Sequence, residues 1–450
     1  MLRVIFEGIF APAVKLMSRL WYWQKFAMLT VLFTIPVGFA LFSFITQIDK
    51  SITFAEKEII GVQYISPILV LLQDMQQHRG MASLYLRGNA SFLPLLLEKE
   101  KKIKEDFILI EASDREFGQE LGTSDLFHDI QKKWGFLEEN YMKLTPKESA
   151  RQHTEFISDM LALIGYVGDT SNLILDPDLD SYYLMNTLVN TLPALSENLG
   201  QARAFTLSVQ DPKKISDGER RDIINYIKIA LIADEKIKRD MRIAFESHNS
   251  LRVVLHEQRE KMSSSVRGFV SLLDTFVTTD AIEMPFPEYY AFSTAVINTN
   301  FSFLESVSIS LKDLLQRRIE GFRAEKQKII YITILSYILI LYFFVGFYLL
   351  VIRTAREFEN IAKQLTSGRA EEVPILSSDE LGNVGESFNV IGRALVTSNN
   401  ENLEKARELQ KRSDEFRQMN EFMIDREVKM VELKKEIERL NPQHDAKNDS

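Results

Sequence analysis

Two long stretches of the chain carry no charged side chain, and they limit what the rest of the sequence can fold into. Residues 26–45 form the first stretch and residues 329–352 form the second. Each is long enough for an α-helix to cross a bilayer, which takes roughly 20 apolar residues. A cleaved signal peptide explains the first stretch less well, because the apolar run is long and no small-residue cleavage pattern follows it. The sequence therefore predicts membrane-spanning helices over residues 26–46 and 328–352.

Basic residues next to these stretches predict how the chain is oriented. The basic residues on one side are Arg3, Lys15, Arg19 and Lys25 before the first stretch and Arg353 and Arg356 after the second. The other side carries Lys50, Lys326 and Lys328, so the bias is modest. We expect both termini in the cytoplasm and residues 47–327 outside. Residues 1–25 mix bases with Trp21, Tyr22 and Trp23, which is typical of a cytoplasmic segment at the membrane interface.

Composition favours a helical protein and excludes some kinds of chemistry. The 450 residues contain only 12 prolines and 19 glycines, and strand-like alternation is absent from residues 47–327. Long helices with short connections predict a helical bundle there, with one or two very long helices between residues 216 and 278. The net charge of −9 argues against nucleic acid as a partner. The absence of cysteine excludes disulfides and thiolate chemistry.

Two arginines stand where a helical pattern requires apolar residues. Residues 68–86 place apolar side chains at alternating spacings of three and four, and Arg79 falls on that seam. Arg203 does the same within residues 188–206. A guanidinium is always charged and is costly to bury alone. The two arginines could therefore converge on one anion, with Arg87 on roughly the same side of the first helix.

The alternative is that each arginine pairs with a buried acid or extends its head group to water. Asp176, Asp178 and Asp180 are candidate acidic partners, and Asp178 or Asp180 could cap a helix that starts near Ser181. Alternating aspartates also occur in calcium loops, but the glycine and glutamate required at the sixth and twelfth positions are absent. The six histidines are not closely spaced. The sequence therefore predicts no metal site.

A family resemblance rests mainly on two stretches. Residues 76–89, QQHRGMASLYLRGN, and residues 171–206, which end in SENLGQARAFT, resemble the nitrate- and nitrite-sensing domain family. They are most similar to the outside domains of a group of bacterial methyl-accepting chemotaxis proteins. The resemblance covers about residues 10–315 and implies an all-helical pair of bundles.

The same resemblance implies a ligand site. Arg79 and Arg203 match the places of the ligand-binding arginines in the family. His78 stands beside the first of them, where some members carry a second basic residue. The implied ligand is a small anion such as nitrate or nitrite. Another small anion, or no anion, remains an alternative.

Residues 353–405 resemble a HAMP linker, the small signalling module that follows the last membrane span of many receptors. The matching residues are Gly368, Pro374, Asp379, Glu380, Gly382, Phe388 and Asn389. The proline that often opens the first HAMP helix is missing near Ala355. Independently of the resemblance, the apolar stripes over residues 358–365 and 384–395 cannot both be buried within one chain. Two chains together would form a parallel four-helix bundle.

A charged helix is predicted to follow the HAMP-like segment. Apolar residues between 419 and 440 alternate by four and three over about three heptads, with Arg426 at one seam position. Residues 406–440 are therefore expected to form a short parallel coiled coil, similar to the linker before the catalytic domains of some sensor kinases. Residues 441–450 form a polar tail that we expect to be disordered. We find no catalytic or output signature, so we do not expect an enzyme.

These features predict an all-α, two-span receptor in the bacterial inner (plasma) membrane. A homodimer would bind a small ligand on the periplasmic side and relay the change through the second span to the HAMP module and the coiled coil. A separate cytoplasmic kinase or another signalling protein would read that change. No cofactor is expected. Two alternatives are a non-sensing scaffold that recruits partners by its coiled coil and a receptor remnant that has lost its output domain.

Overall fold

The computed structural model describes residues 2–209, 214–282, 284–366, 374 and 378–440. Within these ranges the regular structure is helical and contains no strand, which confirms the predicted all-α class. The chain divides into two compact units, and we describe each by itself. One unit is Ala40–Tyr331, and the other consists of Met1–Phe39 and Ile332–Ser450. Two helices, α2 and α10, have residues in both units.

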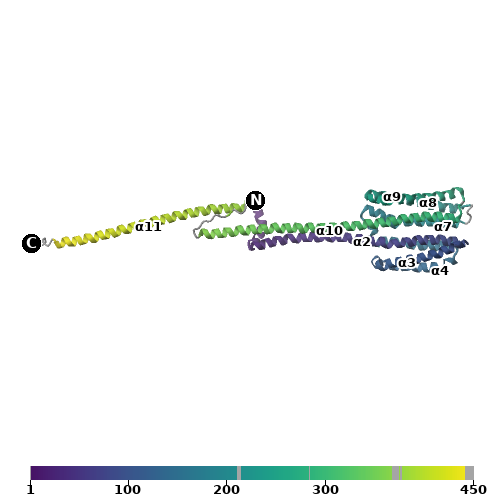
Figure 1. Cartoon of the computed structure of the whole chain (residues 1–450), viewed down its shortest axis with the longest axis horizontal. Coiled ribbons are helices and arrows are strands. Elements are labelled where there is room, and N and C mark those ends of the chain that lie inside the picture. Colours follow the sequence, from purple (N-terminus) through teal and green to yellow (C-terminus); the bar gives the residue numbers. More distant parts are fainter. Residues whose placement is uncertain (1, 210–213, 283, 367–373, 375–377, 441–450) are drawn as a thin grey trace. The chain divides into compact units, whose positions relative to one another are not determined.

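The first unit is a bundle of long helices. Its α-helices, in chain order, are α2 (Tyr22–Leu86), α3 (Leu93–Leu121), α4 (Ser124–Asn140), α5 (Pro146–Thr170), α6 (Leu179–Asn186), α7 (Leu192–Ser208), α8 (Asp217–Ser247), α9 (Asn249–Thr279) and α10 (Phe286–Thr366). Within this unit α2 and α10 run side by side, with α3 and α4 on the side of α2 and α8 and α9 on the side of α10 (Figure 1). One hydrophobic core, from Val62 in α2 to Leu315 in α10, joins the bundle.

The helix boundaries in the bundle follow local signals in the sequence. α2 ends just before Gly88, whose φ of 94° is readily adopted only by glycine. α5 starts at Pro146 after Thr145, whose hydroxyl and backbone N–H form a capping box with Glu148. One or two long helices were predicted for the segment 216–278, and the structure has two. They meet at His248, where neither glycine nor proline indicates a break. A π-helical turn, Thr187–Thr191, connects α6 to α7.

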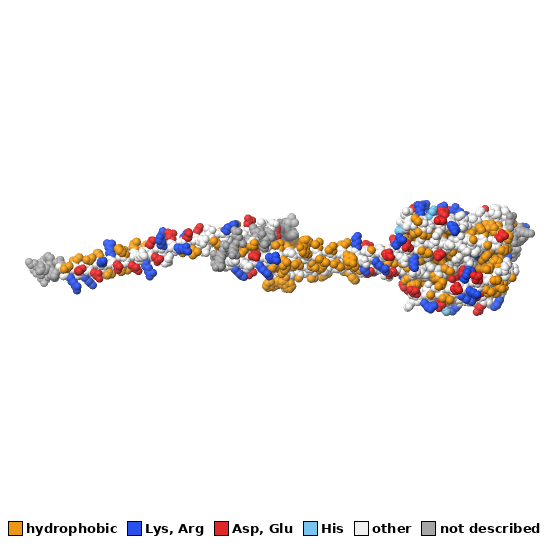
Figure 2. Space-filling model, in the orientation of Figure 1, with side chains coloured by type: hydrophobic (Ala, Val, Ile, Leu, Met, Phe, Trp, Pro, Cys, Tyr) orange, Lys and Arg blue, Asp and Glu red, His pale blue; other side chains and the backbone are white. Residues whose placement is uncertain are grey.

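The second unit contains α1 (Leu2–Met17), the apolar stretches of α2 and α10, and α11 (Glu380–Leu440). The described residues include two helices long and apolar enough to cross a membrane, within Tyr22–Leu86 and Phe286–Gln364. Neither apolar window is buried in the structure, and hydrophobic side chains cover this part of the surface (Figure 2). The two stretches touch through Thr34 and Tyr337, whose hydroxyl oxygens lie 2.7 Å apart. Residues 18–21 separate α1 from α2, so the interfacial segment expected at residues 1–25 is not one helix.

The segment with the HAMP-like sequence brings the end of α10 against the start of α11. The ring of Phe358 stacks on that of Phe388, with centroids 5.6 Å apart and planes 12° from parallel. Asp379 accepts a hydrogen bond from the backbone N–H of Leu381 at 3.0 Å, just ahead of Glu380, the first residue of α11. Gly382 is buried and Asn389 is half-buried, whereas Pro374 is an exposed coil residue. Gly368 and the predicted tail 441–450 lie outside the described residues.

α11 continues without a break through the boundary predicted at residue 405 and ends at Leu440. The apolar side chains of its predicted heptad are all more than half exposed; they are Met419, Met423, Met430, Leu433, Ile437 and Leu440. Such a row of apolar side chains along a solvated helix is what a coiled-coil partner would cover.

Candidate functional site

Among the fully buried side chains of the described residues, those of Arg79 and Arg203 are the largest. Arg79 is 1% exposed on α2, and Arg203 is fully buried on α7. Both seam positions therefore face the interior of the bundle, as the apolar pattern predicted. What each guanidinium meets there decides whether it is a structural group or part of a binding site.

Arg79 meets a carboxylate. Its Nη1 donates to Glu197 Oε1 at 2.6 Å and its Nη2 donates to Glu197 Oε2 at 3.0 Å, which is a bidentate ion pair. Nη1 also donates to Thr154 Oγ1 at 2.9 Å. The Glu197 oxygens accept further hydrogen bonds from Gln201 at 2.8 Å and from Gln76 at 3.1 Å. The counter-ion of Arg79 is thus Glu197, a residue that the sequence did not identify as a partner.

Arg203 meets neutral groups instead. Its Nη1 donates to Thr294 Oγ1 at 2.7 Å, and its Nη2 donates to the backbone oxygen of Gln76 at 2.5 Å. Its guanidinium carbon lies 5.1 Å from the centre of the Tyr290 ring, a cation–π contact. Within the described part of the chain it forms no ion pair. Burial lowers the pKa of Arg203, and the positive charge of Arg79 lowers it further.

Two glycines allow the arginines to approach the opposite helix. A Cβ on Gly200 of α7 would lie 2.6 Å from Arg79 Nη2. A Cβ on Gly80 of α2 would lie 3.3 Å from Arg203 Nε and 2.7 Å from the Tyr290 ring. Each arginine therefore packs against a glycine of the other's helix. The crossing of α2 and α7 buries two guanidinium groups with the single carboxylate of Glu197.

The hydrogen bonds of this crossing are incomplete. The Nε atoms of Arg79 and Arg203 are both buried, and neither has a hydrogen-bond partner among the described residues. The side-chain oxygen of Gln76 is buried without a partner as well. An unpaired buried N–H group costs about 1–3 kcal/mol, and more when the group is charged. The site therefore combines an excess positive charge with two unused N–H donors.

The other predicted basic residues lie elsewhere. His78 is buried on the adjoining face of α2, where its Nδ1 lies 2.8 Å from His153 Nε2. His153 Nδ1 lies 2.7 Å from the backbone oxygen of Ser149, which can only accept, so the hydrogen of His78 Nδ1 points at His153. Burial lowers the pKa of His78. Arg87 is exposed just beyond the end of α2 and shares none of the contacts of the buried pair.

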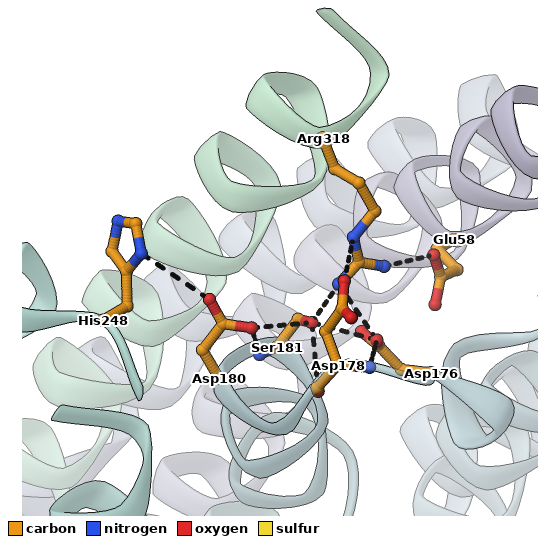
Figure 3. A network of polar contacts seen from close by, with 7 residues as sticks. All are labelled: Glu58, Asp176, Asp178, Asp180, Ser181, His248 and Arg318. Atoms are coloured by element: carbon orange, nitrogen blue, oxygen red, sulfur yellow. Dashed lines mark hydrogen bonds and ion pairs between the residues drawn. The ribbon is translucent and has the colours of Figure 1, made fainter. Parts of the chain in front are cut away.

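Two of the three predicted acidic partners, Asp176 and Asp178, pair with Arg318 of α10, and none of the three pairs with Arg79 or Arg203 in the described structure (Figure 3). Asp176 and Asp178 contact its guanidinium, and Asp180 lies 3.8 Å from His248. The physical reason is distance along α2. Glu58, which also contacts Arg318, precedes Arg79 by 21 residues, or about 31 Å of helix. The aspartates therefore lie at a different level of the bundle.

Sequence reasoning missed three charged residues of these sites, and each for a different reason. Glu58 lies on the same apolar seam of α2 as Arg79, between Ala55 and Val62, so the seam argument could have found it. Glu197 could not be found in this way, because it lies off the seam that contains Arg203 and is buried only because α7 is covered on nearly all sides. Arg318 follows another arginine in a charged stretch that reads as a solvated helix face.

Comparison with known proteins adds little. The sequence matches no known family and no curated protein. Among solved structures, the chain is similar to one described as the structure of the NasR transcription antiterminator, with 13% identity and a TM-score of 0.47. The match covers 80% of this chain and 98% of that chain. A likeness at this level carries no argument about fold or function.

Proposed function

We propose that this protein is a transmembrane signal transducer whose helical bundle, residues 47–327, binds a small anion at Arg79 and Arg203. The observation that carries the proposal is the fully buried guanidinium of Arg203, which forms no ion pair in the described part of the chain. An isolated buried charge is costly, and a bound anion would remove much of that cost.

The unused donors support a small oxyanion as the ligand class. The Nε groups of Arg79 and Arg203 have no acceptor, and planar guanidinium groups suit ligands with two or more oxygens. Nitrate and nitrite fit this description, as the sequence resemblance implies. Close packing around Gly80 and Gly200 favours a ligand of only a few atoms. Neither a cofactor nor catalysis enters the proposal.

The output side of the proposal rests on helix continuity. α10 runs from the bundle into the second apolar stretch and on to Thr366, so it can carry a shift or a rotation along its length. We assign residues 353–405 to a HAMP module, supported by the contact between Phe358 and Phe388. We place the protein in a bacterial inner membrane, with the bundle in the periplasm and both termini in the cytoplasm. A separate cytoplasmic kinase or another signalling protein would read α11.

A homodimer is part of the same proposal. In the HAMP segment Val384, Ile391 and Leu395 are each about half exposed, and the heptad of α11 is exposed as well. A second copy would cover both surfaces, forming a parallel four-helix bundle that continues into a coiled coil.

Cysteine crosslinking tests the dimer. The native chain has no cysteine, so single substitutions report without background. Met423→Cys and Leu433→Cys should each crosslink to the same residue of a second copy, because both lie on the predicted seam. Lys435→Cys, off the seam, is the matched control and should crosslink several-fold more slowly. Equal rates at all three positions would argue against a parallel coiled coil.

Ligand-dependent stability of the full chain in detergent tests the anion site. At a hundredfold excess over its dissociation constant, a bound anion should stabilise the wild type by about 2.7 kcal/mol. Nitrate is compared with chloride at equal ionic strength, followed by nitrite, acetate and phosphate. Arg203→Met should abolish the effect and leave the ligand-free chain at least as stable, because the substitution removes a buried guanidinium that has no counter-ion.

Arg79→Met provides the matched contrast. It should also abolish anion binding, but it leaves Glu197 buried without its partner and should destabilise the ligand-free chain by about 3–5 kcal/mol. If no anion stabilises the wild type and Arg203→Met unfolds the ligand-free chain, both arginines are structural. The scaffold alternative would then be preferred, because Arg79 already has a bidentate carboxylate partner.

A further inference from the structure

A second buried charge cluster lies where α2, α10 and the start of α6 meet (Figure 3). Arg318 Nη1 lies 3.3 Å from Glu58 Oε2, and its Nη2 lies 3.1 Å from Asp176 Oδ1. Its Nε lies 2.8 Å from Asp178 Oδ2. Glu58 comes from α2, and the aspartates come from the turn that leads into α6. Each nitrogen of one guanidinium therefore faces a different carboxyl group.

Two of these three carboxyl groups are shut off from solvent. The side chains of Glu58 and Asp176 are fully buried, and Arg318 is only 12% exposed. Asp178 is 56% exposed, so water can solvate its charge. The buried group thus consists of one guanidinium and two carboxyls. If both carboxyls were ionised, one negative charge would remain buried without compensation.

The hydrogen bonds point to the same imbalance. Within the described part of the chain, Glu58 Oε1 and Asp176 Oδ2 are buried and without a partner, although both carboxyls are directed at the Arg318 guanidinium (Figure 3). Both carboxyls contact the same guanidinium, Glu58 at Nη1 and Asp176 at Nη2, so their charges lie close to each other. Two ionised carboxylates cannot form a hydrogen bond with each other, because neither has a hydrogen to donate. One proton would supply the donor and neutralise the excess charge.

We propose that Glu58 and Asp176 share one bound proton, and that this proton helps hold α2 against α10 through Arg318. Two like charges in close contact do not ionise together, so the pair releases its proton only in alkaline solution. Release leaves an extra buried negative charge and weakens the junction. The cluster is a proton-binding site that makes the contact between α2 and α10 depend on pH.

The pKa shifts agree with this assignment. Burial is the main cause that raises the pKa of Glu58 to about 8, with Asp176 raising it further and Arg318 lowering it. Burial also raises the pKa of Asp176, against the opposing effects of its hydrogen bonds and of Arg318. Among the described residues, Asp178 also raises the pKa of Glu58, whereas Asp180 lies 3.8 Å from His248.

The sign of the pH effect follows from these shifts. A carboxyl group whose pKa is higher in the folded chain binds its proton more tightly there than in the unfolded chain. Its contribution to stability is therefore fully present below the ordinary carboxyl range. It falls as the pH rises through that range toward about 8, and it is lost above that value.

Thermal unfolding of the full chain in detergent between about pH 5 and about pH 9 tests the proposal. The wild-type unfolding temperature should fall as the pH rises. Glu58→Gln, which mimics the protonated side chain, should clearly reduce the fall, and so should Asp176→Asn; the remainder comes from Asp106, a buried carboxyl whose pKa burial raises to about 7. Glu56→Gln is the matched control, since Glu56 lies two residues away on α2 in an exposed ion pair with Arg323. It should keep the wild-type pH dependence.

Infrared spectroscopy of the wild type provides a test that needs no variant to fold. With ¹³C-labelled glutamate, the carbonyl band of a protonated side chain should be present at neutral pH, fall to half near pH 8 and disappear at higher pH. Labelling only glutamate excludes Asp106, a buried carboxyl whose pKa burial raises to about 7. Absence of this band at neutral pH, together with an undiminished pH dependence in Asp176→Asn, would overturn the proposal, because then neither carboxyl carries the proton. An undiminished pH dependence in Glu58→Gln would overturn it as well.

Discussion

Glu197→Gln is expected to destabilise the ligand-free protein by about 3–5 kcal/mol. The substitution keeps the size of the side chain but removes the only carboxylate that the described structure pairs with Arg79. Two fully buried guanidinium groups then remain without a counter-ion, and they repel each other. Denaturant unfolding of the full chain in detergent measures the loss, with helix content as the signal.

The same variant should respond more strongly to anions than the wild type does. An added anion such as nitrate can take the place of the missing carboxylate between Arg79 and Arg203, so it should recover part of the lost stability. Glu155→Gln is the matched control, because Glu155 forms an exposed ion pair with Arg151 and should behave like the wild type. A Glu197→Gln variant with wild-type stability would show that this pair does not support the crossing of α2 and α7.

Gly200→Ala should destabilise the protein by about 1–3 kcal/mol, the usual cost of overpacking a closely packed interior. The new methyl group would lie 2.6 Å from Arg79 Nη2, so the bidentate pair with Glu197 must shift or break. The variant should also bind anions more weakly than the wild type, because one of the two proposed ligand-binding side chains is displaced. Unfolding curves with and without nitrate measure both effects.

Gly165→Ala is the control for the general effect of replacing a helical glycine. Gly165 lies within α5, and a Cβ there meets nothing within 4 Å. Alanine is the better helix former by up to about 1 kcal/mol, so this variant should be as stable as the wild type or more stable. If Gly200→Ala behaves like Gly165→Ala, the close contact between α7 and Arg79 is not needed for stability.

Local patterns accounted for most of the secondary structure. The capping box of Thr145 and the proline at position 146 mark the start of α5, and the glycine at position 88 follows the end of α2. These signals act through neighbouring backbone groups, so a short window of sequence contains them. The break at His248 did not follow from the sequence because neither glycine nor proline stands there.

For the candidate sites, the sequence predicted the direction of the buried arginines but not their partners. The apolar seam on α2 was enough to place Arg79 in the interior, and the seam on α7 did the same for Arg203. The partners of these residues did not follow from any pattern. Asp176 and Asp178 were plausible partners by charge, yet they pair with Arg318, which lies more than 130 residues away along the chain.

The sequence by itself determined the all-helical class, the two long apolar helices and the inward direction of both buried arginines. Each of these depends on periodicity or composition within one segment. Only the tertiary structure decided that Glu197, 118 residues from Arg79, is its counter-ion, and that Arg203 has none in the described structure. It also decided that Glu58 meets Arg318, 260 residues away. The physical reason is that charge pairing in a bundle depends on the level at which helices cross, and packing between distant segments sets that level.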